Sequence, residues 1–342
     1  MELYTREISL DGFLAVRGPA VVVVAGGLVE AMGFPVGAGF RLVVPRARAV
    51  LLRGENARIQ VSGSPGSALV ELSSGEIEEA YSVAREAARR KSMIVGPVDS
   101  GKSTLASLVA GLAAASGARP ELLTIDVGQN EVYCPGFASL ASVNPPVVPG
   151  STASFTVERS CFVGSFTPSA MLERYKRCSL ELSQSPPPLV IDTDGWVEER
   201  GLQAKAEIAV EAGVELVVAL GLDREKLAVF ESRGLEVASL KPLARSAKTS
   251  EERRLHRERL IASKLAGARR YSVPLDSVVF LGDQRPRPGA GLIAAVYVKK
   301  SPHPGLLVRV DERKGKAVVL APVSASPELV EAGVSEVSIL EL

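Results

Sequence analysis

The sequence predicts an α/β protein in which a P-loop NTPase-type, mostly parallel sheet is flanked by a small N-terminal and a small C-terminal β domain. Residues 96–104, GPVDSGKST, fit the phosphate-binding pattern G-x-x-x-x-G-K-[ST] at every fixed position. From Ser92 onward, short apolar strands alternate with helical segments, which is typical of a parallel sheet. Both ends of the chain consist instead of β-branched runs punctuated by glycine and proline. We therefore expect domains over residues 1–90, 91–270 and 271–342.

The composition of the chain excludes some classes of protein. Of the 342 residues, 46% are hydrophobic and 23% are charged, which is enough apolar material for the cores of two or three domains. The apolar stretch at residues 20–27 is far shorter than the roughly 20 residues that a membrane span needs. The three cysteines, Cys134, Cys161 and Cys178, include no CxxC pair, and their number is odd. We therefore expect a cytoplasmic protein with no disulfide framework, no zinc site and no membrane association.

The first 80 residues form most of the predicted N-terminal β domain. Short β-branched runs separated by glycine and proline are typical of a small sandwich or barrel. These runs lie at residues 21–24, 41–44, 49–52, 58–61 and 68–72. A helix is expected over residues 76–90, because glutamates at its start and arginines at its end complement the helix dipole. The domain shows no chemical constellation, so we interpret it as a packing or partner-docking module.

The phosphate-loop motif predicts a nucleotide triphosphate site, because a strand precedes it at residues 93–95 and a helix follows it at residues 105–115. Its glycines let backbone N–H groups turn towards the phosphates, and the helix offers its positive N-terminal end. Lys102 is expected between the β- and γ-phosphates, and the Ser103 hydroxyl is expected to bind Mg²⁺. The residues expected to contact the nucleotide are Gly96, Pro97, Asp99, Ser100, Gly101, Lys102, Ser103 and Thr104.

Two acidic residues compete for the role of the Walker B carboxylate, which holds the Mg²⁺ shell. Asp126 follows a predicted strand at residues 122–125, and Asp192 closes a later strand at residues 189–192. The carboxyl ends of parallel strands meet at one edge of a sheet, where P-loop enzymes place this acid. From spacing alone either residue fits, and a plain capping role at the strand end is the alternative for each. Further elements are expected as helices at residues 171–182 and 204–212 and a strand at 216–220.

The segment from Lys241 to Lys300 is strongly basic. Its fourteen Lys and Arg outnumber five acidic residues, which gives a net charge of +9. Such a block can hold a polyanion, but a solvated helix face is an equal alternative, because Glu251 and Glu252 can pair with nearby arginines. The Ser-Ala-Lys tripeptide that starts at Ser246 resembles a base-contacting loop of GTPases, which we discount because the chain has no NKxD motif. The C-terminal β domain is expected to contain strands at residues 278–281, 292–299, 306–310 and 317–320.

Four segments of the chain form an ordered set of motifs. They are GPVDSGKSTL from Gly96, TIDVGQNEVYCPG from Thr124, the turn at Thr167 and Pro168, and VIDTDGWVEERG from Val190. Together they resemble the polynucleotide 5′-hydroxyl kinase family, which includes RNA kinases of tRNA-splicing and mRNA 3′-end cleavage complexes, the pre-ribosomal RNA kinase and archaeal relatives. The resemblance extends to the three-part architecture and covers essentially the whole chain. DVGQ followed by PG, together with DGW, is much more specific than the phosphate loop alone.

The resemblance implies a role for each motif. Catalytic roles fall to Lys102, Asp126, Arg245 and Arg253, and acceptor-binding roles fall to Gln129, Thr167, Pro168 and Trp196. Asp126 would be the base for the 5′-hydroxyl and would hold Mg²⁺ with Ser103, while Trp196 would stack on an RNA base. The chain departs from the family at Ala170, where glycine is usual, and at Asp192, where asparagine is usual. The two lid arginines, Arg245 and Arg253, are also farther apart than the family leads us to expect.

These observations lead to three hypotheses of function. The resemblance implies a kinase that uses ATP and Mg²⁺ to phosphorylate the 5′-hydroxyl of RNA, and the sequence leaves open whether DNA is also an acceptor. The alternative is a catalytically silent, ATP-bound scaffold of an RNA-processing complex. A generic P-loop ATPase or GTPase switch is disfavoured by the missing NKxD motif and by the DGW motif. The expected partners are RNA 5′ ends and RNA-processing proteins, and the sequence does not fix the oligomeric state.

Overall fold

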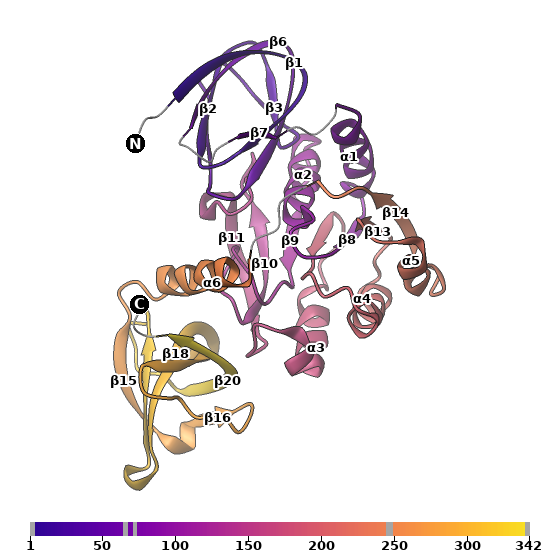
Figure 1. Cartoon of the computed structure of the whole chain (residues 1–342). Coiled ribbons are helices and arrows are strands. Elements are labelled where there is room, and N and C mark those ends of the chain that lie inside the picture. The colour runs from indigo at the N-terminus through magenta and orange to yellow at the C-terminus, as the bar shows by residue number, and fades with distance from the viewer. Residues whose placement is uncertain (1–3, 64–67, 71–73, 244–248, 339–342) are drawn as a thin grey trace. The chain divides into compact units, whose positions relative to one another are not determined.

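The structure, a computed structural model, describes residues 4–63, 68–70, 74–243 and 249–338 (Figure 1). Three sheets are formed within these ranges. The chain divides into two compact units, each of which is built from three separate segments. The first unit comprises Met1–Leu123, Leu140–Glu158 and Ser183–Ala247, and the second comprises Thr124–Ser139, Arg159–Leu182 and Lys248–Leu342. The domain boundaries expected near residues 90 and 270 stay a prediction.

The N-terminal sheet belongs to the first unit and has seven strands. They are β1 (Tyr4–Arg17), β2 (Ala20–Gly26), β3 (Val29–Ala31), β4 (Phe34–Val36), β5 (Arg41–Val44), β6 (Ala49–Gly63) and β7 (Ala68–Val70). β6 pairs antiparallel with β1, β2 and β3, so the two runs expected at residues 49–52 and 58–61 are one strand of 15 residues. Ala57, Ile59 and Val61 are buried and alternate with exposed residues, as in any half-buried strand. β1, whose first half is mostly polar, was not expected.

The central sheet has the strand order β11-β10-β9-β12-β8-β13-β14. Its strands are β8 (Lys91–Val95), β9 (Glu121–Thr124), β10 (Phe137–Val143), β11 (Phe155–Phe162), β12 (Leu189–Asp192), β13 (Leu216–Leu220) and β14 (Glu236–Leu240). β12, β8, β13 and β14 pair in parallel in this order. β8, β12 and β13 are buried almost throughout, which is why they read as continuous apolar runs. The predicted α/β fold with a mostly parallel sheet is confirmed.

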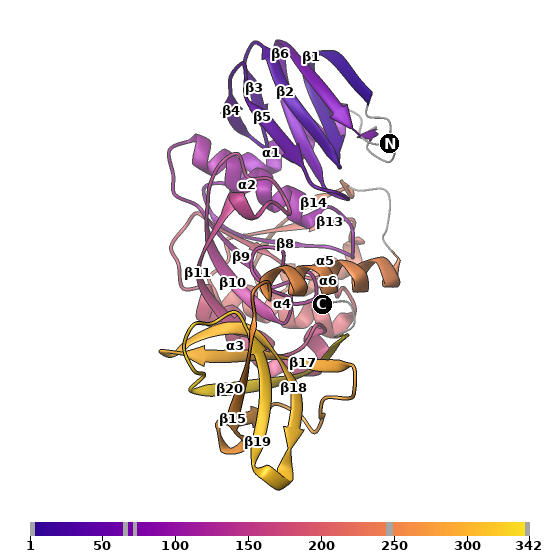
Figure 2. The ribbon, with the colours of Figure 1, turned by 90° about the vertical axis from the view of Figure 1, so that its left-hand side faces the viewer.

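Helices connect the parallel strands. The first unit contains α1 (Ser74–Ala87), α2 (Lys102–Ala115), α4 (Glu199–Glu211) and α5 (Arg224–Glu231), and the second contains α3 (Leu172–Leu182) and α6 (Ser250–Lys264). α1 and α2 lie side by side (Figures 1 and 2). A Cβ on Gly111 of α2 would lie 1.9 Å from the backbone oxygen of Met32, so glycine is required where α2 meets the turn between β3 and β4. Of the helices in the described ranges, none is long and apolar enough to cross a membrane.

The C-terminal sheet lies in the second unit and has the order β15-β19-β18-β17-β20-β16. Its strands are β15 (Arg269–Pro274), β16 (Val278–Phe280), β17 (Ala290–Val298), β18 (Ser301–Asp311), β19 (Lys316–Ala321) and β20 (Leu329–Ser338). Buried apolar side chains such as Leu292, Val319 and Val330 form its core. β16 to β19 correspond to the four expected strands, whereas β15 and β20 were not expected.

The cysteine pattern led to one wrong expectation. Cys161 near the end of β11 and Cys178 on α3 form a disulfide, with their Cα atoms 5.4 Å apart. The chain turns back after β11 and returns as α3, so two cysteines 17 residues apart become neighbours. Cys134 is free and buried. Neither the odd number of cysteines nor their spacing could reveal this pair, because the fold of the intervening turn decides it.

Candidate functional site

The phosphate-loop residues form one turn between β8 and α2. Gly96 is required there, because a Cβ would lie 2.5 Å from a backbone oxygen at the end of β13. Asp99 (φ +59°) and Gly101 (φ +97°) have left-handed backbone conformations, which turn the loop into the helix. Lys102 is 6% exposed, and its Nζ donates to the backbone oxygen of Pro97 at 2.8 Å, so the ammonium lies against the loop. The eight residues expected to bind a nucleotide are thus contiguous in space, and their individual roles stay a prediction.

Asp192 is the acidic residue in contact with the phosphate loop. It ends β12, where it pairs in register with Ile94 of β8. The Ser103 hydroxyl donates to Asp192 Oδ2 at 2.7 Å, and Asp192 is only 5% exposed. The buried Ser100 hydroxyl has no hydrogen-bond partner among the described residues. Because hard cations such as Mg²⁺ prefer oxygen ligands, this group of hydroxyls and a carboxylate fits a nucleotide with Mg²⁺.

Asp126, the other candidate for the Walker B carboxylate, lies in the second unit just after β9. Its Oδ1 accepts hydrogen bonds from the backbone N–H groups of Gly128 at 3.1 Å and Gln129 at 3.0 Å. This is the local capping turn that an aspartate at a strand end can form. The Gln129 side chain in turn donates to the backbone oxygen of Arg253 on α6 at 3.3 Å. The structure therefore brings Asp126, Gln129 and Arg253 together in the second unit.

The turn at Thr167 and Pro168 follows an aromatic residue that α6 covers. Thr167 is exposed, and Pro168 begins the short 3-10 helix η2 (Pro168–Met171). Arg257 of α6 lies over the ring of Phe166, with its Cζ 4.7 Å from the ring centroid, which is a cation–π arrangement. Burial lowers the pKa of Arg257, and the nearby Asp126 carboxylate is among the charges that oppose this shift. Arg257 thus joins the Asp126 cluster, which consists of Asp126, Gln129 and Arg253, although no sequence motif assigns Arg257 a definite role.

The arginines of the basic block on α6 are of two kinds. Arg254 is exposed and pairs with Glu258, one turn later, at 3.1 Å, although the Glu258 side chain is only 10% exposed. Arg253 and Arg257, in contrast, are only partly exposed and belong to the Asp126 cluster. Arg245, the other expected lid arginine, lies outside the described residues. The block therefore supplies an ion pair within the helix and two arginines for the candidate site.

Trp196 lies in the first unit, in the loop that follows β12. It is half-buried, and its backbone contacts Asp194 and the side chain of Lys205 on α4. Asp194 lies within the DGW motif, but no sequence signal pointed to Lys205, because a lysine on an amphipathic helix is usually solvated. Both residues were missed as part of the site.

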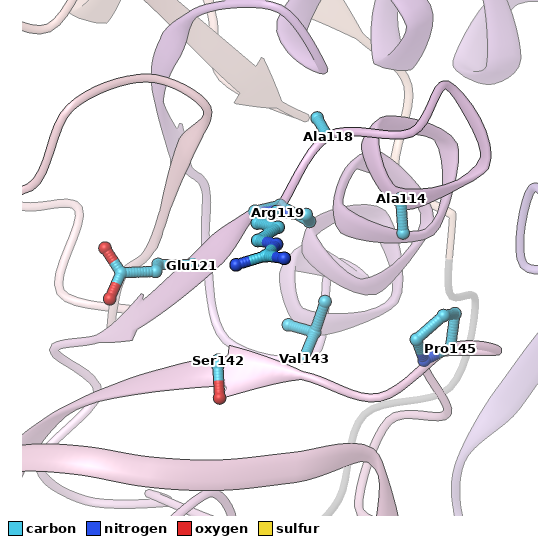
Figure 3. Close-up of a pocket in the computed structure, with 8 residues that line it drawn as sticks. Ala114, Ala118, Arg119, Glu121, Ser142, Val143 and Pro145 are labelled. Atoms are coloured by element: carbon cyan, nitrogen blue, oxygen red, sulfur yellow. The ribbon is translucent and has the colours of Figure 1, made fainter.

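A separate pocket of about 430 Å³ lies in the first unit at the end of α2 (Figure 3). It is lined by Ala114, Ala118, Arg119, Pro120, Glu121, Ser142, Val143 and Pro145. Arg119 extends among the other labelled side chains in the close-up. None of the expected site residues lines this pocket, so the candidate site is the phosphate loop and the residues around it.

The phosphate loop between a buried parallel strand and a helix, with a strand-end carboxylate on its serine, places the protein in the class of P-loop nucleotide-binding proteins. Within this class, residues 96–265 match the family described as mRNA cleavage and polyadenylation factor CLP1 P-loop. The match spans about half of the chain. The resemblance to polynucleotide 5′-hydroxyl kinases, stated above from the motifs, is confirmed by the names of its relatives.

The relatives are similar over part of their length. The polyribonucleotide 5′-hydroxyl-kinase Clp1 of Xenopus tropicalis is 28% identical over 246 residues, which is 65% of this chain and 56% of the relative. The protein of the same name from Homo sapiens is 33% identical over 147 residues, 40% of this chain and 34% of the relative. The Protein CLP1 homolog of Arabidopsis thaliana is 28% identical over 192 residues, 53% of this chain and 41% of the relative. The matches thus cover between about a third and just over half of these relatives.

Two solved structures share the fold over nearly the entire chain. The wild-type Clp1p–Pcf11p complex contains a chain that superposes with a TM-score of 0.72 at 15% identity, covering 98% of both chains. A second structure, which describes an extended interface between Pcf11p and Clp1p and ATP loss in a point mutant, gives a TM-score of 0.73 at 14% identity. At these identities the similarity establishes the fold.

Proposed function

We propose that the protein is an ATP-dependent polynucleotide 5′-hydroxyl kinase that transfers the γ-phosphate of ATP to the 5′-hydroxyl of RNA, with DNA left open as a second acceptor. The observation that carries the proposal is the match of residues 96–265 to a family whose vertebrate members bear the name polyribonucleotide 5′-hydroxyl-kinase. The intact phosphate loop and the contact of Ser103 with Asp192 support the nucleotide-binding part of the proposal, which an ATP-bound scaffold would share.

Residues of the first unit bind ATP in the proposed reaction. Backbone N–H groups of residues 96–104 and the N-terminus of α2 bind the triphosphate, and Lys102 contacts the β- and γ-phosphates. Ser103 binds Mg²⁺ together with Asp126 or with Asp192, the carboxylate that accepts the hydrogen bond from Ser103. When bound, the metal neutralises charge on the phosphate oxygens.

The acceptor half of the proposed reaction begins with Asp126. Its carboxylate, oriented by two backbone N–H groups, accepts the proton of the 5′-hydroxyl while the hydroxyl oxygen bonds to the γ-phosphorus. The bond from the γ-phosphorus to the β–γ bridging oxygen breaks, and ADP leaves with that oxygen. Arg253 and Arg245 offset the charge that spreads over the transferring group.

Four residues are proposed to hold the 5′ end of the acceptor. Gln129, Thr167 and Pro168 contact the terminal nucleotide, and Trp196 stacks on its base. Stacking of this kind contributes about 1–3 kcal/mol per base and tolerates any base, because every base has a π-face. The protein should therefore phosphorylate single-stranded ends of different sequence.

The experiment that tests the proposal offers labelled ATP and a 5′-hydroxyl oligoribonucleotide. Label should appear on the RNA with the wild-type protein and disappear with Lys102→Ala and with Asp126→Asn. Lys226→Ala and Asp223→Asn, which change exposed residues of the first unit, are the matched controls and should retain activity. Absence of label with a wild-type protein that demonstrably binds ATP would overturn the proposal.

Asp126 and Asp192 can be distinguished by the metal. If Asp192 holds Mg²⁺ beside Ser103, Asp192→Asn should raise the Mg²⁺ concentration needed for half-maximal transfer, whereas loss of a base in Asp126→Asn should not be restored by added Mg²⁺. Recovery of the Asp126→Asn protein at high Mg²⁺ would assign the metal to Asp126 instead.

The second candidate is an ATP-bound scaffold of an RNA-processing complex. It is favoured by the solved structures of similar fold, which are Clp1p in complex with Pcf11p. The two candidates differ in turnover: a scaffold retains ATP without producing ADP in the presence of 5′-hydroxyl RNA, whereas a kinase produces one ADP for each RNA end that it phosphorylates.

A further inference from the structure

Lys205 of α4 has a charged side chain that is almost completely buried. Its side chain is 1% exposed, and its Nζ donates to Asp194 Oδ1 and to the backbone oxygen of Trp196, both at 2.7 Å. Burying an ammonium costs free energy unless it is paired and hydrogen-bonded. Both of these partners belong to the loop that carries Trp196, so the buried charge acts on that loop.

The same carboxylate also holds the other side of the Trp196 backbone. Asp194 Oδ1 accepts a hydrogen bond from the Trp196 N–H at 2.8 Å, in addition to the bond from Lys205. The N–H and the carbonyl oxygen of Trp196 are therefore both fixed, one directly by Asp194 and one by Lys205. Because these two groups flank the Cα atom, they also fix the direction in which the indole leaves the backbone.

The indole ring itself lies on the first turn of α4. A Cβ on Gly201 would lie 2.6 Å from Trp196 Cδ2 and 2.7 Å from Cγ, closer than real side chains approach. The ring thus packs where only a hydrogen fits, yet the residue remains partly exposed. A ring that is supported by a helix and still accessible is what a base-stacking platform requires.

The Trp196 loop also touches the phosphate loop. A Cβ on Gly195 would lie 2.7 Å from the N and Cα atoms of Val98, so the two loops are in direct backbone contact. The Thr193 hydroxyl donates to the backbone oxygen of Ile94, on the strand that leads into the phosphate loop, at 2.8 Å. The position of Trp196 is therefore defined relative to the site expected to bind ATP.

We propose that Lys205 is a positioning residue for the acceptor: through Asp194 and the Trp196 carbonyl it holds the indole as a rigid stacking platform for the 5′-terminal base, at a fixed place relative to the phosphate loop. The inference rests on the proposed function, because it takes the stacking of Trp196 on an RNA base from that proposal. Lys205 is buried beneath this loop and does not touch the reacting atoms.

The test uses Trp196 as its own probe, since it is the only tryptophan in the chain. In Lys205→Met, without RNA or ATP, the fluorescence anisotropy of Trp196 should fall and quenching by acrylamide should increase. Trp196→Ala is expected to raise the KM for a single-stranded 5′-hydroxyl oligoribonucleotide by about 5-fold to 150-fold over wild type, measured with ATP present. The KM of Lys205→Met for the same RNA should approach that value, while its KM for ATP stays unchanged. Lys226→Met, on the exposed face of α5, is the matched control and should behave as wild type.

A second variant tests the same platform without removing a charge. Gly201→Ala should displace the indole, shift its emission maximum and raise the KM for RNA, whereas Gly75→Ala on α1, where a Cβ would meet nothing within 4 Å, should do neither. Gly201→Ala decides the question if Lys205→Met does not fold. Wild-type anisotropy and KM for RNA in a folded Lys205→Met protein, or in Gly201→Ala, would overturn the inference.

The KM for RNA of Trp196→Ala, compared with that of Lys205→Met, separates this inference from the proposed function. If Trp196→Ala leaves the KM for RNA unchanged, stacking is not part of acceptor binding and the inference fails with it, even if Lys205→Met frees the indole. If Trp196→Ala raises the KM for RNA but Lys205→Met does not, the kinase and its stacking residue stand and the positioning role of Lys205 alone is refuted.

Discussion

Replacement of Lys205 by methionine is expected to lower the free energy of unfolding of the first unit by about 3–5 kcal/mol, the usual cost of breaking a buried ion pair by removing one partner. Methionine has nearly the same length and volume as the aliphatic part of lysine, so little of this cost comes from lost packing. The Asp194 side chain is 7% exposed and would lose the ammonium that now lies 2.7 Å away.

The hydrogen bonds of Lys205 lead to the same magnitude. A hydrogen bond to a charged group contributes about 1.5–3 kcal/mol, and the Lys205 ammonium donates two, to Asp194 and to the Trp196 carbonyl. A surface pair provides the contrast. Arg58 and Glu7 are 3.8 Å apart, with side chains 65% and 56% exposed, so Arg58→Met should cost less than about 1 kcal/mol.

The assay is unfolding in urea, followed by the fluorescence of Trp196 and by circular dichroism, for Lys205→Met, Asp194→Asn and the double variant. Because each single variant leaves one buried charge without the opposite charge that now pairs with it, the double variant should be less destabilised than the sum of the two by about 1–3 kcal/mol. A cost for Lys205→Met no larger than that of Arg58→Met, or strict additivity in the cycle, would refute the reasoning.

Three further predictions concern stability. Gly75→Ala should raise the free energy of unfolding by up to about 1 kcal/mol, because alanine has the higher helix propensity. Gly111→Ala should lower the free energy of unfolding by about 1–3 kcal/mol, because its Cβ would lie 1.9 Å from a backbone oxygen. Unfolding in urea distinguishes the two signs. Replacing Cys161 and Cys178 by serine should cost about 3 kcal/mol through the entropy of the unfolded chain, and a reducing agent should destabilise the wild type alone. Burial raises the pKa of the Cys134 thiol to about 12, so between pH 9 and pH 12 the unfolded chain loses a proton that the folded protein keeps. The free energy of unfolding should therefore fall as the pH rises through this range. It should fall less steeply in Cys134→Ala.

The phosphate loop could be predicted from the sequence because every part of it is local. A buried strand, a glycine turn and a helix follow one another directly, and their geometry depends on backbone preferences within a few residues. The strand-helix alternation of the central sheet is local in the same sense, since buried parallel strands read as apolar runs. The motifs around Asp126 and Trp196 were visible for the same reason, as short strings that follow predicted strands.

Contacts between distant residues could not be predicted in this way. The sequence makes Asp126 and Asp192 equal candidates by spacing, and it gives no sign that parallel pairing of β12 with β8 places Asp192 on Ser103, 89 residues away. β1 has a mostly polar first half that gives no strand signal, and it is a strand because β6 pairs with it along almost its whole length. The same limit hid the disulfide, whose two cysteines meet only because the chain turns back on itself.

Lys205 shows this limit most clearly. Its place on α4 predicts a solvated lysine, and the residues that bury and pair with it lie in the loop before that helix. Short stretches of sequence therefore determine the residue types and local conformations of the nucleotide site. The burial of Lys205, the contact of Ser103 with Asp192 and the support of Trp196 depend instead on which segments pack together. Packing depends on contacts between residues distant along the chain, and local patterns carry no information about those contacts.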